Sequence, residues 1–303
     1  MAGAILKEAP GAALDFDRPM REMTYLRIGG AADLLVTPSS SEEAAGVVRA
    51  LGALGENILV IGGGTNLLVR DAGIRGAVIR MSSLTHLLHV DDKGGEVLLS
   101  VGAGLPLNKL LGHARVEGLS GIEGLAGIPG YVGGAIAGNA GSFGSEMMDV
   151  VREISLIGPD GKAYSLRAGE FTPGYRSSGL PEGSVITGAL LVLGREEPSA
   201  VAARMDEALS RKKETQPLGQ RSAGCVFKNP PGDSAGRLID AAGCKGMREG
   251  SVEVSSIHAG FFINANGGTA GDFMKLMERV SARVLDVFGT SLESEIKVVG
   301  VDA

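Results

Sequence analysis

The sequence of 303 residues has no tryptophan, few other aromatic residues and only two cysteines. Two cysteines, Cys225 and Cys244, are too few for a disulfide framework and indicate a reducing compartment. No uncharged stretch is long enough to span a bilayer, and the N-terminus lacks the charged and apolar blocks of a signal peptide. We therefore expect a cytoplasmic protein without a membrane partner.

Other absences narrow the class of protein further. Lysine and arginine form no basic stripe and the net charge is −6, so no nucleic-acid partner is expected. No Cys/His cluster has metal-ligand spacing, so no bound metal is expected. We also expect a monomer. Glycine, by contrast, is abundant at 48 residues without a collagen period, which favours tight turns and close backbone approach around an extended ligand.

Periodicity, capping residues and turn residues predict an α+β protein. Residues 1–20 are small, polar and unpatterned and are expected to form an arm. Helices are predicted at 41–54, 107–117, 198–215 and 234–242, and from Thr269 to Gly289. Strands are predicted at 32–36, 57–61, 76–81, 96–101, 151–157, 162–167, 184–193 and 261–264. A domain boundary is expected near residues 212 and 213.

Two glycine-rich segments are the strongest candidates for ligand contacts. Residues 62–66 (GGGTN) directly follow a predicted strand, where successive backbone N–H groups can converge on an anion such as pyrophosphate. Residues 121–144 contain nine glycines and few charges, so this long loop is expected to be buried against something. The glycine spacing of residues 62–66 matches neither the Rossmann dinucleotide-binding motif nor the Walker A motif. For one such turn alone, a tight structural connection remains the simpler interpretation.

Three sequence runs resemble known flavoproteins. IGGGTNLLVRDAGIRGAVIR (61–80) resembles the diphosphate loop of vanillyl-alcohol-oxidase-type (PCMH-type) FAD-binding folds. GLAGIPGYVGGAIAGNAGSFG (124–144) and TYLRIGGA (24–31) resemble segments of UDP-N-acetylenolpyruvoylglucosamine reductases. The resemblance covers residues 24–300 and implies an FAD-binding domain at 21–212, with lobes at about 21–80 and 81–212. A C-terminal α+β substrate-binding domain would follow at 213–303.

The resemblance also implies the cofactors and their contacts. FAD would be non-covalent, because no histidine lies within residues 62–66, and NADPH would be the reductant. The implied FAD contacts are Arg27, Gly62, Gly63, Gly64, Thr65, Asn66, Leu67, Gly127, Ile128, Pro129, Gly130, Gly133, Asn139 and Gly141.

Three further motifs of the same family imply the catalytic residues. Arg176, in GYRSS, would pair with the enolpyruvyl carboxylate of the substrate. Cys225, in AGCVFKNP, stands where the common pattern has a serine as proton donor, and a thiol is a chemically reasonable acid. Glu295, in LESEIK, is favoured as the catalytic carboxyl group over Glu293 by the family register alone. Without these motifs, a surface arginine, a buried cysteine and a solvated glutamate would be the default interpretations.

The substrate implied by the family is a UDP-sugar, UDP-N-acetylglucosamine enolpyruvate, which is reduced to UDP-N-acetylmuramate in peptidoglycan synthesis. Tyr175, Lys213 and Asn229 are the implied substrate contacts, although Lys212 or Lys228 could take the role of Lys213. His258 is expected to be packed or bonded to backbone. Two alternatives stay open: another FAD-linked oxidase of the same fold, and a non-catalytic flavin-binding scaffold.

Overall fold

The computed structural model describes residues 1–302, which form two compact units. Unit 1 consists of residues 1–16, 34–63 and 76–211, and unit 2 of residues 17–33, 64–75 and 212–303. This division differs from the expected linear one, because two early segments join the C-terminal residues in unit 2. Segments this far apart in sequence come together through tertiary packing, which local patterns do not reveal.

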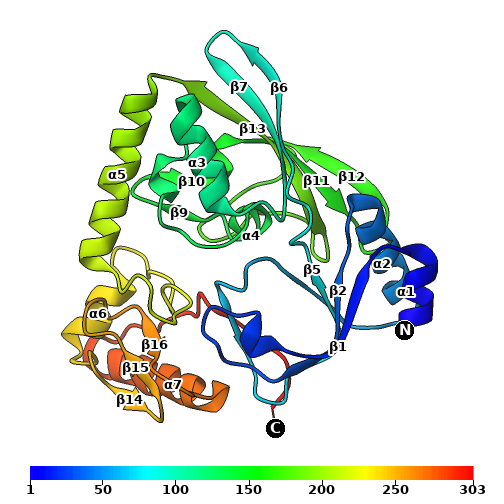
Figure 1. Ribbon diagram of the computed structural model, residues 1–303. Helices are drawn as coiled ribbons and strands as arrows, with labels where there is room; N and C mark the ends of the chain where they lie inside the picture. The colour runs from blue at the N-terminus through cyan, green and yellow to red at the C-terminus, as the bar shows by residue number, and fades with distance from the viewer. Residues whose placement is uncertain (303) are drawn as a thin grey trace. The chain divides into compact units, whose positions relative to one another are not determined.

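Unit 1 contains a six-stranded antiparallel sheet with the order β12-β11-β13-β7-β6, in which β8 also pairs with β13 (Figure 1). Its strands are β6 (Leu87–Lys93), β7 (Glu96–Gly102), β8 (Leu119–Ser120), β11 (Val151–Ile157), β12 (Ala163–Arg167) and β13 (Val185–Arg195). A second sheet has the order β1-β2-β5-β3, formed by β1 (Ala13–Pro19), β2 (Ala31–Thr37), β3 (Ile58–Ile61) and β5 (Ile74–Arg80). Strands β3 and β5 are parallel.

The longer helices of unit 1 are α1 (Ala2–Glu8), α2 (Ser41–Ala53), α3 (Leu107–Glu117) and α5 (Pro198–Thr215), whose last turn belongs to unit 2. The glycine-rich loop (residues 121–144) contains a 3-10 turn (Glu123–Leu125), the short helix α4 (Val132–Ala137) and strand β9 (Gly141–Ser142). Strand β10 (Ser145–Glu146), which pairs with β9, and a second 3-10 turn (Met147–Val150) follow the loop directly. The loop thus contains short elements joined by glycines rather than one long regular element.

Unit 2 is built around α7 (Ala270–Phe288), whose apolar stripe is buried. Phe273 packs its ring against Phe262 with centroids 5.5 Å apart. The unit also contains α6 (Ala235–Ala241), a sheet of β14 (Arg248–Glu249), β15 (Val252–Val254) and β16 (Phe262–Asn264), and the parallel pair β4 (Leu67–Val69) and β17 (Lys297–Val299). A 3-10 turn, Met20–Glu22, lies near its start.

Most predicted elements are confirmed, and one expectation is wrong. Helices α3 and α5 have the predicted bounds, and Thr269 and Gly289 cap α7 as expected. The expected N-terminal arm instead contains α1 and β1. Ile5 is fully buried, and α1 approaches α2 so closely that a Cβ on Gly46 would lie 2.4 Å from the Glu8 carbonyl oxygen. A single buried apolar residue gives no periodic pattern that would predict a helix. Tertiary packing therefore determines the conformation of this segment.

Candidate functional site

Arg176 lies at the tip of a tight turn in unit 1. The backbone of Gly174 and Ser177 exchanges two hydrogen bonds, with N···O distances of 2.9 and 3.1 Å. Arg176 is the third residue of this turn and has φ +56°, a conformation that in a type II turn normally calls for glycine. Its guanidinium stacks over the Tyr175 ring, 5.0 Å from the centroid. The turn therefore presents Arg176 and Tyr175, both predicted site residues, side by side.

Asn139 is buried and ties three segments of unit 1 together. Its Nδ2 donates to Glu146 Oε2 (2.6 Å) and to the Gly174 carbonyl oxygen (3.2 Å), and its Oδ1 accepts from the backbone N–H of Met148 (3.1 Å). The bond to Gly174 reaches the first residue of the Arg176 turn. Asn139 thus has a positioning role toward that turn, which its place in a glycine-rich motif did not reveal.

The two glycine-rich segments meet within unit 1. A Cβ built on Gly62 would lie 3.7 Å from the Tyr131 side chain and 3.9 Å from the Gly134 backbone nitrogen, and a Cβ on Gly134 would have no atom within 4 Å. By contrast, Cβ atoms on Gly133 and Gly141 would lie 2.8 Å from Ala103 Cβ and 2.7 Å from the Ser145 carbonyl oxygen. Gly133 and Gly141 are therefore explained by protein packing, whereas Gly62 and Gly134 leave room for a ligand to approach the backbone.

Residues 64–66 of the first glycine turn belong to unit 2. Gly64 has φ +64°, and a Cβ there would lie 2.0 Å from the Met23 carbonyl oxygen. The Gly64 carbonyl oxygen accepts from the Tyr25 N–H at 2.9 Å. Only glycine allows this close crossing of the 23–28 loop, in which Arg27 has φ +57°. The turn and the TYLRIGGA segment, separate in sequence, are thus packed on each other.

Positive φ angles single out predicted site residues. Among residues 1–302, five non-glycine residues have positive φ: Asp17, Arg27, Asn139, Phe143 and Arg176. Three of the five, Arg27, Asn139 and Arg176, are residues that the motifs nominate. Such strain costs about 1–3 kcal/mol per residue and clusters at functional sites, which supports all three nominations.

In unit 2, the Cys225 segment pairs with the Glu295 segment. The Glu295 N–H donates to the Val226 carbonyl oxygen at 2.8 Å, and the Lys228 N–H donates to the Glu293 carbonyl oxygen at 2.8 Å. Asn66 Nδ2 donates to the Glu295 carbonyl oxygen at 3.2 Å. Three motifs separated by up to 229 residues therefore meet within this unit. Arg176, the third predicted catalytic residue, belongs to unit 1.

The two glutamates of the C-terminal motif have different surroundings. Glu293 is largely exposed and forms an ion pair with Lys228, so its carboxylate is already neutralised at the surface. Glu295 is half-buried. This difference agrees with the family register, which favours Glu295 as the functional carboxyl group.

The adjacent lysines at the end of α5 also differ. Lys212 is 2% exposed, and burial lowers its pKa to about 8, whereas Lys213 is exposed. An exposed ammonium can reach a phosphate without leaving a buried position. Lys213 therefore remains the better candidate for a diphosphate contact.

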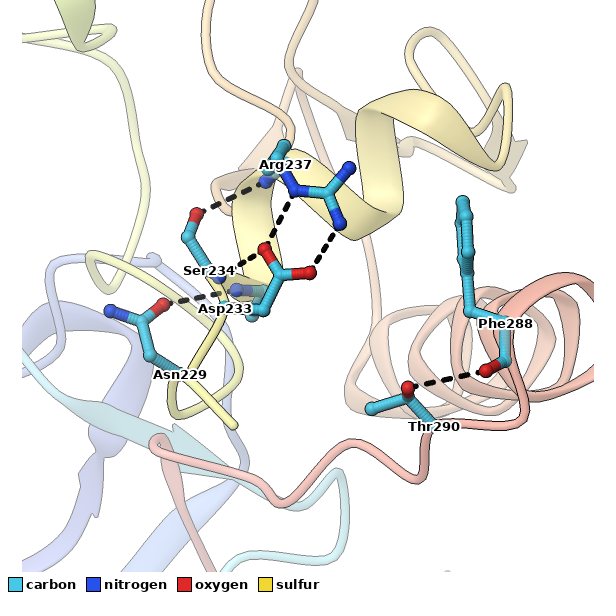
Figure 2. Close-up of polar contacts among 7 residues, drawn as sticks. Asn229, Asp233, Ser234, Arg237, Phe288 and Thr290 are labelled. Carbon is cyan, nitrogen blue, oxygen red and sulfur yellow. Dashed lines mark hydrogen bonds and ion pairs between the residues drawn. The ribbon is translucent and has the colours of Figure 1, made fainter. Parts of the chain in front are cut away.

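Asn229 supports the start of α6 (Figure 2). Its Oδ1 accepts from the Ala235 N–H at 3.0 Å, and the hydroxyl of Ser234, the N-cap, accepts from the Arg237 N–H at 3.2 Å. Arg237 in turn pairs with Asp233, its Nε 2.6 Å from Oδ1. The side-chain oxygen of Asn229 thus anchors the loop that follows the Cys225 motif.

The described part of the chain contains neither a cluster of metal-ligating side chains nor a helix that could span a membrane. Residues 1–302 contain no group of three or more His, Cys, Asp or Glu side chains arranged to hold a metal ion. His89 and His113 form a pair, with 2.9 Å between their Nε2 atoms. Within the same residues, no helix is both long enough and apolar enough to cross a bilayer.

Comparisons with known proteins agree with the motifs. A family model described as UDP-N-acetylenolpyruvoylglucosamine reductase, C-terminal domain, matches residues 216–299, and an FAD-binding-domain model matches residues 32–167. The UDP-N-acetylenolpyruvoylglucosamine reductase of Geobacter sulfurreducens is 41% identical over 285 residues, which cover 94% of this chain and 93% of that protein.

Solved structures extend the comparison to the fold. The crystal structure of UDP-N-acetylenolpyruvylglucosamine reductase from Thermus caldophilus is 36% identical with a TM-score of 0.80, covering 95% of this chain and 99% of that one. The berberine bridge enzyme from Eschscholzia californica, 15% identical with a TM-score of 0.50 over 64% of this chain and 43% of that one, shares the fold alone. The expected α+β flavoprotein fold is confirmed, and this chain belongs to the UDP-N-acetylenolpyruvoylglucosamine reductase family.

Proposed function

We propose that the chain catalyses the NADPH-dependent reduction of UDP-N-acetylglucosamine enolpyruvate to UDP-N-acetylmuramate with non-covalent FAD, a step of peptidoglycan synthesis. Family membership over nearly the whole chain supports the reaction class. The observation that argues most directly for retained chemistry is the pairing of the Cys225 and Glu295 segments through Val226. A decayed scaffold has no reason to keep both motifs on paired segments.

The glycine-rich segments fit an FAD diphosphate. Gly62 and Gly134 present backbone without side chains, so phosphate oxygens can approach the N–H groups closely. FAD, when bound and reduced by NADPH, would supply the hydride for the β-carbon of the enol ether. The residues proposed to hold FAD are the contacts that the resemblance implies, together with Tyr131 and Gly134, which are not among those implied contacts.

Three side chains are proposed to act on the substrate. Arg176 binds the enolpyruvyl carboxylate through its planar guanidinium and stabilises the charge that develops there. Glu295, held protonated, donates a hydrogen bond to the same group rather than repelling it. Cys225 transfers its thiol proton to the α-carbon, and the resulting thiolate regains a proton from solvent before the next turnover.

The UDP moiety is proposed to contact Lys213, Tyr175 and Asn229. The exposed ammonium of Lys213 suits the diphosphate, and Tyr175 lies next to Arg176 on the same turn. We further propose that the protein acts as a cytoplasmic monomer without nucleic-acid or membrane partners. Light scattering after size-exclusion chromatography tests the monomer, and a dimer mass would reject it.

Anaerobic stopped-flow absorbance at the flavin band tests the reaction. The FAD-loaded protein is first reduced with NADPH and then mixed with UDP-N-acetylglucosamine enolpyruvate. We expect the substrate to reoxidise the flavin in wild-type protein and in Cys225→Ser, which keeps a proton donor of similar size. We expect Cys225→Ala to slow the coupled proton transfer by about 10²-fold or more. A flavin that stays reduced until air is admitted would reject the reductase and favour an oxidase.

A further inference from the structure

His258 and the thiol of Cys225 share the space above Gly260 in unit 2. A Cβ on Gly260 would lie 3.0 Å from His258 Cε1, 3.1 Å from His258 Nδ1 and 3.4 Å from Cys225 Sγ. The ring also lies close to Gly236, because a Cβ there would lie 2.8 Å from His258 Cε1. Phe261 adds an edge contact with ring centroids 5.0 Å apart. The imidazole thus occupies a fitted slot beside the sulfur.

Backbone hydrogen bonds connect the ring to the Cys225 segment. His258 Nδ1 accepts from the Gly260 N–H at 3.1 Å, and the Gly260 carbonyl oxygen accepts from the Val226 N–H at 2.9 Å. Cys225 itself forms an antiparallel bridge with Phe261. Because Nδ1 accepts, the neutral ring has its proton on Nε2. The imidazole therefore fixes Gly260, and Gly260 fixes the residue after the proposed proton donor.

We propose that His258 is a positioning residue for Cys225: as a neutral imidazole it holds the Gly260–Val226 contact and lets the neighbouring sulfur stay a thiol. This inference rests on the proposed role of Cys225 as proton donor. Protonation of the ring removes both effects. A protonated Nδ1 cannot accept from Gly260, and an imidazolium beside the sulfur favours the thiolate, which has no proton to donate.

Burial and nearby charges determine the pH at which the His258 ring becomes protonated. Burial lowers the pKa of His258 below its ordinary value, and Lys245 acts in the same direction. The carboxylate of Asp240 and a hydrogen bond to the backbone of His258 itself oppose the shift. Lys245 and Asp240 are ion-paired at 2.6 Å, so their effects on the ring partly cancel. The neutral ring therefore dominates at pH 7, and turnover falls only at more acidic pH, where the ring becomes protonated.

Two substitutions separate the two effects of the imidazole. His258→Asn retains an acceptor for the Gly260 N–H but cannot titrate, whereas His258→Leu removes the acceptor. In anaerobic turnover at pH 7.5 we expect kcat within about threefold of wild type for His258→Asn. For His258→Leu we expect a fall of about 10²-fold in kcat, from misplacement of the acid, with little change in KM. Below pH 6 the wild-type kcat should decline while that of His258→Asn stays level.

Thiol reactivity tests the same idea without turnover. Rates of iodoacetamide alkylation of Cys225 are measured from pH 5 to 8.5 in FAD-loaded protein with Cys244→Ala; Cys244 is fully buried and is removed as a control. The ratio of the rate with His258 to the rate with His258→Asn should be level above pH 7.5. It should rise about tenfold toward pH 5, because the imidazolium promotes the thiolate.

The outcomes distinguish the inference from the proposed function. A ratio that stays level from pH 5 to 8.5 would overturn the inference even if Cys225→Ala proves inactive. If Cys225→Ala turns over normally but the ratio rises, the coupling of His258 to the thiol stands and the proton donor has to be sought elsewhere. Should His258→Leu fail to fold, the ratio measured with His258→Asn still decides.

Discussion

Replacing Arg176 with glycine should stabilise the protein relative to alanine while leaving both variants inactive. Arg176 has φ +56° at the third position of its turn, where a residue with a Cβ is strained by about 1–2 kcal/mol. Glycine relieves that strain but loses about 0.5–1 kcal/mol more conformational entropy on folding. The difference favours Arg176→Gly over Arg176→Ala by about 0.5–1 kcal/mol.

The pair is well matched because both substitutions remove the same side-chain contacts. Each loses the guanidinium and its stacking over Tyr175, so those terms cancel in the comparison. Each should also lower kcat/KM by about 10²-fold or more, because the carboxylate of the substrate loses its charged partner. Arg176→Lys keeps the positive charge without the planar fork, and we expect an intermediate loss of activity.

Urea unfolding and thermal melts of the FAD-loaded variants measure the effect. A difference of about 0.5–1 kcal/mol corresponds to about 1–3 °C in Tm for a chain of this size. Equal stability of the glycine and alanine variants would refute the strain argument. If Arg176→Gly turns over as fast as wild type, the guanidinium is not needed for the reaction. The proposed functional reason for an arginine at this positive φ would then fail.

Three further predictions follow from single contacts. Asn139→Asp places a second carboxylate 2.6 Å from that of Glu146 and removes the N–H donor to Gly174. In steady-state assays kcat/KM should therefore fall at least tenfold. The fall should be larger than that of Asn139→Gly when both variants have the same flavin occupancy. Asp71 accepts from two backbone N–H groups at the start of α7 at 2.9 and 3.0 Å; urea unfolding of Asp71→Ala should show a loss of about 1–2 kcal/mol, and an unchanged midpoint would contradict this capping role. Burial lowers the pKa of Lys212 from 10.5 to about 8, so between these pH values the unfolded chain binds more protons than the folded protein and the stability contributed by this site rises with pH. Relative to Lys212→Met, the free energy of unfolding of wild type should therefore increase by up to about 3 kcal/mol from pH 8 to 10.5. If urea unfolding shows the same pH dependence for both proteins, the pKa shift is excluded.

Local sequence patterns were sufficient to predict the elements that depend on interactions within a single segment of the chain. The bounds of α3 and α5 and the caps of α7 follow from helical periodicity, from Thr269 and from Gly289, because capping and side-chain spacing act within a few residues. His258 also behaves as expected, because its ring nitrogen accepts a hydrogen bond from the backbone. The motifs likewise identified the family before any contact was known.

Only the tertiary structure decided which of these segments meet. Residues 17–33 and 64–75 pack with the C-terminal unit, and Asn66 reaches Glu295 across 229 residues of sequence. The bond from Asn139 to Gly174 and the slot that His258 shares with the Cys225 sulfur are equally invisible in local patterns. Such contacts depend on where the chain returns after many intervening elements. Periodicity and turn residues describe the conformation of a segment and not its neighbours in space.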